Sequence, residues 1–194
     1  MKASLLALLG SLSMFFLQAQ RVEATLAVGD LAVIRVNNST DSFSYVALRD
    51  IPANEVLKWT DSSWNSSNGA WRTSENSGAT ITSASAISAG SVFNISTSGL
   101  NNGGEQVFLY TGDFLGTSTS ASAGFVYGVN WDNSGWLTTG SVGSTSVSYM
   151  PSTLGGASVE LGTGDAWYYN GPTAGTQASL LTAINNPANW STGS

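Results

Sequence analysis

The sequence predicts an all-β sandwich with one short C-terminal helix. Two observations favour this class. Short runs of apolar, β-branched and aromatic residues recur along the chain, with the alternation typical of strands. Asn-Gly dipeptides at Asn68-Gly69, Asn102-Gly103 and Asn170-Gly171 punctuate them, and both residues tolerate the positive φ of a tight turn. Strands and turns at this spacing are typical of a sandwich or small barrel.

The strongest strand pattern lies near the start of the chain, where three runs predict a meander over 30–37, 43–49 and 56–60. This meander leads into a loop rich in tryptophan and small polar residues, over 60–71. Further strands are predicted over 91–96, 105–111, 124–130, 157–161 and 166–169.

One helix is predicted, over 177–185. Thr176 is a suitable N-cap, and Pro187 stops the helix. Leu180, Leu181 and Ile184 fall on one face. Because a helix of about two turns is unstable alone, we expect this face to pack on a sheet.

Residues 1–24 have the pattern of a secretory signal peptide: Lys2, an apolar run over 3–17, and small residues before Thr25. We expect cleavage before Thr25, with cleavage after Ala19 as the alternative, and a single sandwich domain over 25–194. The apolar run is shorter than the roughly 20 residues of a membrane span. We therefore expect a freely secreted protein without a membrane span.

Cysteine is absent, so the fold must depend on burial and backbone pairing instead of disulfides. Cleavage before Thr25 would leave eleven acidic and four basic residues, a net charge of −7. A surface of this charge repels nucleic acid and anionic membranes. The basic residues all precede Thr73, which suits a calcium-binding or sugar-facing surface. The alternative is a secreted protein that hydroxyl and amide groups keep soluble.

The absence of histidine and cysteine excludes Ser-His-Asp and Cys-His catalysis and the zinc sites that use these ligands. Serine-lysine catalysis would require Lys58, which we expect to face outward from a strand. A carboxylate pair drawn from Asp61, Asp132 and Asp165 is the remaining enzymatic alternative, as in glycoside hydrolases. Loop carboxylates are common in secreted domains, and we expect no enzymatic activity.

Three loops place aspartate near tryptophan among Ser, Asn and Gly. Indole faces stack on the C–H faces of sugar rings, while carboxylate and amide groups bond sugar hydroxyls. The candidate ligand-binding residues are Asp61, Trp64, Trp71, Asp132, Trp136, Asp165 and Trp167. A place in the core is the alternative for each tryptophan. We expect Trp64 and Trp136 to be partly exposed and near one another at one end of the sandwich.

Calcium is the candidate cofactor. It takes six to eight oxygen ligands, and the sequence Asp-Asn-Ser-Gly at 132–135 resembles part of a calcium loop, although it lacks the acidic spacing of an EF-hand. Asp132 and Asp165 are the candidate metal ligands.

Two stretches of low complexity, 117–122 and 138–148, predict surface loops. Five asparagines fit the N-glycosylation pattern, which predicts that some of them carry glycans if the source is a eukaryote. They are Asn37, Asn38, Asn65, Asn94 and Asn189.

The chain resembles a poorly characterised group of secreted proteins that are distantly similar to the lamin-tail, immunoglobulin-like domain. The resemblance covers nearly the whole chain after residue 25. It rests on 29–34, 43–48, 50–53, 60–64, 104–110, 125–130, 165–172 and 180–190. It implies an immunoglobulin-like or related β-sandwich in a secreted or surface protein, often beside adhesive or calcium-binding modules. It implies no catalytic residues.

These patterns together predict a secreted, non-enzymatic protein of an extracellular matrix or cell wall that binds polysaccharide or a matrix protein through its Trp/Asp loops. The alternatives are a carbohydrate-active enzyme with a carboxylate pair, and a structural subunit that self-associates.

Overall fold

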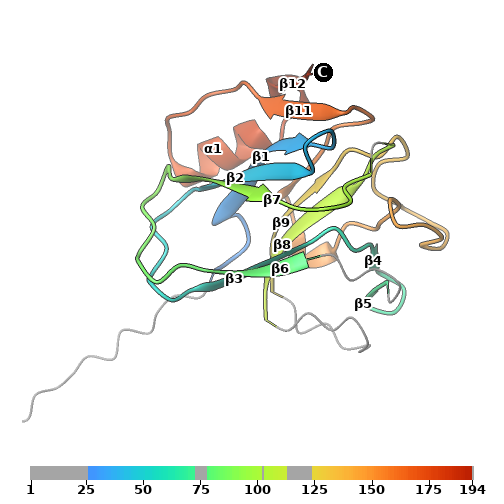
Figure 1. Ribbon diagram of the computed structural model, residues 1–194, viewed down its shortest axis with the longest axis horizontal. Coiled ribbons are helices and arrows are strands. Elements are labelled where there is room, and N and C mark those ends of the chain that lie inside the picture. Colours follow the sequence, from blue (N-terminus) through green and yellow to red (C-terminus); the bar gives the residue numbers. More distant parts are fainter. Residues whose placement is uncertain (1–25, 73–77, 102, 113–123, 194) are drawn as a thin grey trace, which may run out of the picture.

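The computed structural model describes residues 26–72, 78–101, 103–112 and 124–193. Two five-stranded sheets pack face to face and confirm the predicted all-β sandwich (Figure 1). The first contains β1 (Leu31–Asn37), β2 (Ser42–Ala47), β7 (Val92–Ser96), β11 (Ala166–Tyr169) and β12 (Trp190–Gly193). The second contains β3 (Val56–Thr60), β6 (Gly78–Thr82), β8 (Gln106–Thr111), β9 (Gly124–Asn130) and β10 (Ser158–Glu160).

The strand order is β12-β11-β1-β2-β7 in the first sheet and β10-β9-β8-β3-β6 in the second. All pairs are antiparallel except β9 with β10, which is parallel. Phe43 of β2 and Trp59 of β3 meet edge to face, with ring centroids 5.3 Å apart. This contact joins the two sheets across a core that the inward-facing side chains of both fill.

A short hairpin covers part of the second sheet. It consists of β4 (Trp64–Asn65) and β5 (Ala70–Trp71), joined by a turn in which Gly69 has a φ of 63°. The predicted Asn68-Gly69 turn is therefore confirmed. Trp71 packs on Phe108 of β8 and Phe125 of β9, which explains why these strands are buried on both faces.

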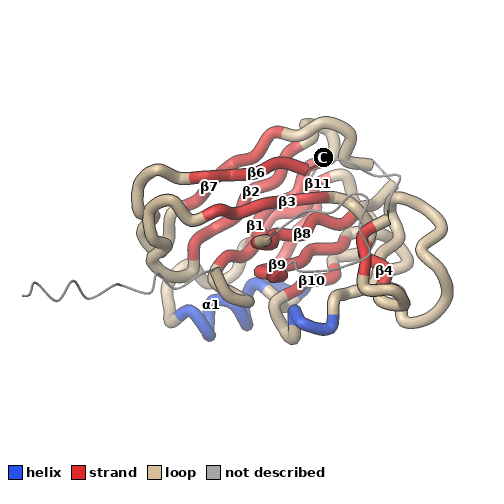
Figure 2. Tube along the Cα trace, turned by 90° about the horizontal axis from the view of Figure 1, so that it is seen from below, coloured by secondary structure: helices blue, strands red, loops and turns tan. Residues whose placement is uncertain are grey.

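The predicted C-terminal helix is confirmed as α1 (Gln177–Ile184), and it lies outside the layers of strands (Figure 2). The Thr176 side chain caps it by accepting a hydrogen bond from the Ser179 N–H. Ile184 is buried, and Gln177 Nε2 donates to the Gly29 carbonyl at 3.1 Å. Two 3₁₀ turns, Ser152–Leu154 and Pro187–Asn189, complete the described structure.

The eight predicted strands are all present, with ends that differ by up to two residues. The sequence reading missed β6, β12 and the β4–β5 hairpin. The predicted loop over 138–148 is irregular and largely exposed, in agreement with the sequence. The predicted signal peptide, Asn102 and the 117–122 stretch lie outside the described residues. Within the part of the chain that is described, no helix is long and apolar enough to cross a membrane.

Candidate functional site

The Trp/Asp loops lie at strand ends that the topology brings toward one end of the sandwich. β3 and β9 both pair antiparallel with β8, so the two strands run in the same direction and finish at the same end of the second sheet. Asp61, after β3, and Asp132, after β9, therefore lie at this end. Asp165 precedes β11, where Ala166 pairs with Asn37 at the end of β1. β1 begins beside β9, since the Gly29 N–H bonds the Val126 carbonyl at 2.9 Å.

Gln106 organises the polar groups at this end of the second sheet. It is fully buried, and its Nε2 donates to the Asp61 carbonyl, to Glu105 Oε1 at 2.7 Å and to the Thr145 carbonyl at 2.8 Å. Ser63 Oγ donates to the same Thr145 carbonyl at 2.9 Å. The segment after β3 is thereby attached to the 138–148 loop.

Asp132 holds the turn that follows β9. Its Oδ1 accepts from the Ser134 N–H at 2.7 Å, and its carbonyl accepts from the Gly135 N–H at 3.0 Å. This is the local bonding expected of an aspartate in a turn. The next residue, Trp136, donates its N–H to Glu160 Oε2 at 3.0 Å. Asp132 therefore shapes its own loop.

Three of the candidate tryptophans belong to one aromatic cluster. Trp64 and Trp71 are buried, with 6% and 5% of their surface exposed, and both contact Phe125. Trp136 is half-buried and packs on Phe108, with centroids 5.5 Å apart. The prediction that Trp64 is partly exposed is wrong. The β4–β5 hairpin folds back over the second sheet and places Trp64 inside the cluster.

The remaining candidates belong to the first sheet. Asp165 is exposed and Trp167 is half-buried on β11. Among the described residues, no group of three or more Asp, Glu, His or Cys side chains lies close enough to hold a metal ion. Calcium binding by Asp132 and Asp165 stays a prediction.

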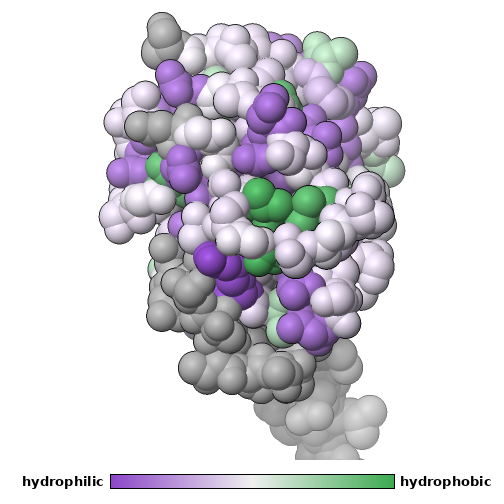
Figure 3. Space-filling view, turned by 90° about the vertical axis from the view of Figure 1, so that its right-hand side faces the viewer, coloured by the Kyte–Doolittle hydropathy of each residue, from purple (hydrophilic) through white to green (hydrophobic). Residues whose placement is uncertain are grey.

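A crevice of about 190 Å³ lies between the hairpin and the 3₁₀ turn Ser152–Leu154. Trp64 and Phe125 supply aromatic surface, and the hydroxyl-bearing residues Ser66, Ser152 and Thr153 are all exposed beside it. Among the described residues that line it, none is charged. Figure 3 views the end of the molecule that carries the hairpin, a mostly polar or neutral surface whose most prominent apolar area lies near its centre.

The sequence reading identified Trp64 for this crevice but missed Ser152, Thr153 and Phe125. Phe125 is in an apolar strand and resembles any other core residue. Ser152 and Thr153 follow Pro151 in a short 3₁₀ turn that carries no aspartate or tryptophan. The only signal that could have drawn attention to them is a Pro-Ser-Thr turn in a chain of few prolines.

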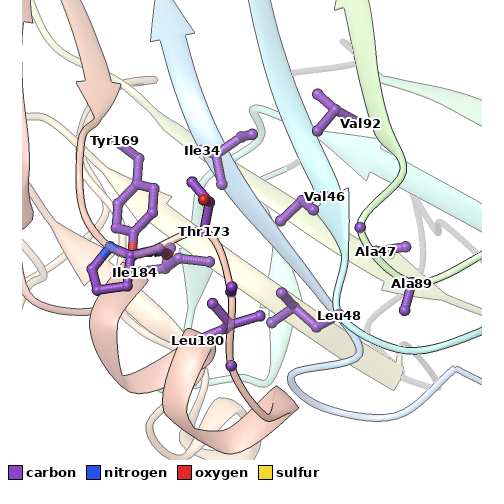
Figure 4. A pocket seen from close by; sticks show the side chains of 14 residues that line it. Ile34, Val46, Ala47, Leu48, Ala89, Val92, Tyr169, Thr173, Leu180 and Ile184 are labelled. Atoms are coloured by element: carbon purple, nitrogen blue, oxygen red, sulfur yellow. Dashed lines mark hydrogen bonds between the residues drawn. The ribbon is translucent and has the colours of Figure 1, made fainter.

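A larger cavity, of about 440 Å³, lies between the first sheet and the segment around α1. Figure 4 shows Ile34, Val46, Leu180 and Ile184 extending into the same space from β1, β2 and α1. Tyr169 lines the cavity and donates its hydroxyl to the Pro172 carbonyl at 2.9 Å, which holds the covering loop in place. The lining is mostly aliphatic, so it offers few directional contacts to a ligand.

Comparisons with protein families, with characterised proteins and with solved structures found no match to this chain. The resemblance to the lamin-tail, immunoglobulin-like group stays a prediction.

Proposed function

We propose that this chain is a secreted, non-enzymatic protein that binds a neutral polysaccharide of an extracellular matrix or cell wall. The observation that carries the proposal is the crevice beside Trp64 and Phe125. Its volume of about 190 Å³ suits one sugar ring at a time. A polysaccharide would therefore bind through one residue or chain end, with the remainder in solvent.

The crevice combines the two kinds of contact that sugars require. The apolar faces of a pyranose pack on aromatic rings, and its hydroxyls exchange hydrogen bonds with serine and threonine, which both donate and accept. Ser152 and Thr153 stand on one side and Ser66 on the other. Because the lining residues carry no charge, the crevice favours a neutral sugar over a uronic acid or a sulfated one.

The geometry gives less support to the enzymatic alternative. Glycoside hydrolysis requires two carboxylates about 5 to 10 Å apart across a cleft that holds the sugar. Asp61 is buried, Asp132 bonds its own turn, and Asp165 lies on the other sheet. None of the three lines the crevice.

The proposal that the chain is secreted is supported by its sequence, since residues 1–24 have the pattern of a secretory signal peptide.

A glycan array with and without calcium tests the proposal. We expect binding to neutral polysaccharides that is lost in the double variant Ser152→Ala/Thr153→Val. The matched control is Ser191→Ala/Thr192→Val, which alters an exposed Ser-Thr pair on β12. Binding that requires calcium would support calcium as a cofactor, and its loss in Asp132→Asn or Asp165→Asn would support these two ligands.

Two outcomes would contradict the proposal. One is an array without any binding to neutral glycans. The other is release of reducing sugar by the wild type that disappears in Asp61→Asn, Asp132→Asn or Asp165→Asn while the variant remains folded, because that result would identify an enzyme.

A further inference from the structure

Strands β6 and β7 are the terminal strands of the two sheets, and they lie on the same side of the sandwich. β7 ends the order of the first sheet after β2, and β6 ends that of the second after β3. Because the Phe43–Trp59 contact joins β2 to β3, the two edges are neighbours. In Figure 2 both strands run along the same margin of the molecule.

As described, β6 and β7 lack the features that usually prevent edge strands from pairing with other chains. Such features are charged side chains, proline, bulges and very short strands. Residues 76–104 contain no Asp, Glu, Lys, Arg or Pro. The ladders of β2 with β7 and β3 with β6 each have five consecutive pairs without a register shift. By contrast, β10 at the opposite edge has three residues and carries Glu160.

The hydrogen bonds of β7 show which backbone groups face outward. The Thr97 N–H bonds the Asp41 carbonyl at 2.7 Å, and the Ser91 carbonyl accepts from the Ala47 N–H at 3.0 Å. In an antiparallel ladder the bonding direction alternates along the strand, so odd-numbered residues face β2. The N–H and C=O groups of Val92, Asn94 and Ser96 therefore face the open edge. Their side chains are exposed, that of Val92 by 51%.

Two aspartates fix the segment that contains β7. Asp50 Oδ1 accepts from the Ala89 N–H at 2.8 Å, and Asp41 Oδ1 accepts from the Leu100 N–H at 2.9 Å. These contacts hold the chain on either side of β7 and keep the nearest carboxylates bonded to its flanks. The edge is thus ordered in advance, which lowers the conformational entropy lost when another strand pairs with it.

We propose that β7 pairs antiparallel with β7 of a second copy of this chain, about a twofold axis at Asn94. This register places Val92 opposite the partner's Ser96 and Asn94 opposite the partner's Asn94. Each such pair exchanges two backbone hydrogen bonds, and two facing asparagine amides can each donate and accept. The interface is isologous, as in most homodimers.

Charge argues for a second copy as the partner. The chain has a net charge of −6, so two copies repel over most of their surface. Contact through the uncharged 76–104 side keeps this repulsion lowest. A cationic partner would gain little from β7 itself, because the strand carries no carboxylate.

Sedimentation equilibrium of the purified chain, made in a bacterial host so that Asn94 carries no glycan, tests the proposal. We expect a concentration-dependent dimer between about 1 μM and about 1 mM. Asn94→Lys should weaken the dimer at least about tenfold by placing like charges face to face. Ala178→Lys on the exposed surface of α1 adds the same charge and should leave the dimer unchanged.

A second variant, Asn94→Pro, removes the outward N–H without removing a backbone hydrogen bond to β2, although the Ser44 hydroxyl loses its acceptor, Asn94 Oδ1. This variant should also yield monomers. Hydrogen exchange should show that the amides of Val92, Asn94 and Ser96 become protected as the dimer forms. A chain that is monomeric throughout the concentration range would overturn the proposal. So would a dimer that persists in both Asn94 variants, since it would use another surface.

Discussion

Trp64 and Trp71 meet edge to face across the β4–β5 hairpin, with ring centroids 5.2 Å apart. This contact makes the hairpin part of the core, because both rings also pack on Phe125 of the second sheet. It also limits how much of the Trp64 ring a ligand can contact. Because Trp64 is only 6% exposed, it offers a small part of its ring to the crevice.

Replacing Trp71 should therefore lower stability strongly. We expect Trp71→Ala to reduce the free energy of unfolding by about 3–5 kcal/mol, as for other large aromatic residues in cores. Trp71→Phe should cost less, because the smaller ring retains part of the contact with Phe108. Denaturant unfolding measures both. Equal stability of Trp71→Ala and the wild type would show that the hairpin does not belong to the core.

Gln106 should matter for the loop that it holds as well as for stability. Gln106→Ala leaves the carbonyls of Asp61 and Thr145 without this donor, which should cost about 1–3 kcal/mol. Hydrogen exchange should accelerate over 144–148 in this variant. Gln177→Ala removes a glutamine that bonds Gly29 and Asp30 elsewhere, and it serves as the control. Faster exchange over 144–148 in the control would contradict a local role for Gln106.

Asp30 should make stability depend on pH. Burial acts to raise the pKa of Asp30, but hydrogen bonds and charge from Arg49, together with the Ala27 N–H and Gln177, lower it overall. Arg49 Nη2 lies 2.7 Å from Asp30 Oδ2. A carboxyl whose pKa is lower in the folded state stabilises the fold above its unfolded pKa of about 3.9. That contribution is lost as the pH falls through the lower, folded pKa.

Unfolding measured between about pH 2 and pH 6 should show this loss. In Asp30→Asn the decline toward acid should become shallower, and stability at neutral pH should fall because the ion pair between Asp30 and Arg49 is lost. Asp165→Asn, which removes an exposed carboxylate, should retain the wild-type profile. An Asp30→Asn profile parallel to that of the wild type would contradict the assignment.

Much of the sandwich is predictable from sequence, because its longer strands are buried and rich in β-branched and aromatic residues. β8 and β9 are examples. β6 was missed because Gly-Ala-Thr-Ile-Thr has small or polar side chains that are nearly all exposed, so its apolar pattern is weak. β12 depends on pairing with β11 and carries little strand pattern of its own. These elements form through tertiary contacts that local propensity does not encode.

The candidate site was less predictable for a related reason. A tryptophan in a polar loop looks the same whether the loop projects into solvent or folds back on a sheet. The β4–β5 turn folds the loop back and buries Trp64 against the second sheet. No local pattern indicates that the hairpin covers Phe108 and Phe125. The aspartates were similarly ambiguous, since Asp132 bonds its own turn.

The measurement that tests the central claim most directly is an NMR titration of the ¹⁵N-labelled chain with the neutral saccharide that the glycan array selects. Saccharide binding in the crevice should shift the amide signals of Ser66, Ser152 and Thr153 and the indole signal of Trp64, while the indole signal of Trp167 stays in place. Saturable shifts at Trp167 and Asp165, with an unchanged Ser152 and Thr153, would contradict the proposed site.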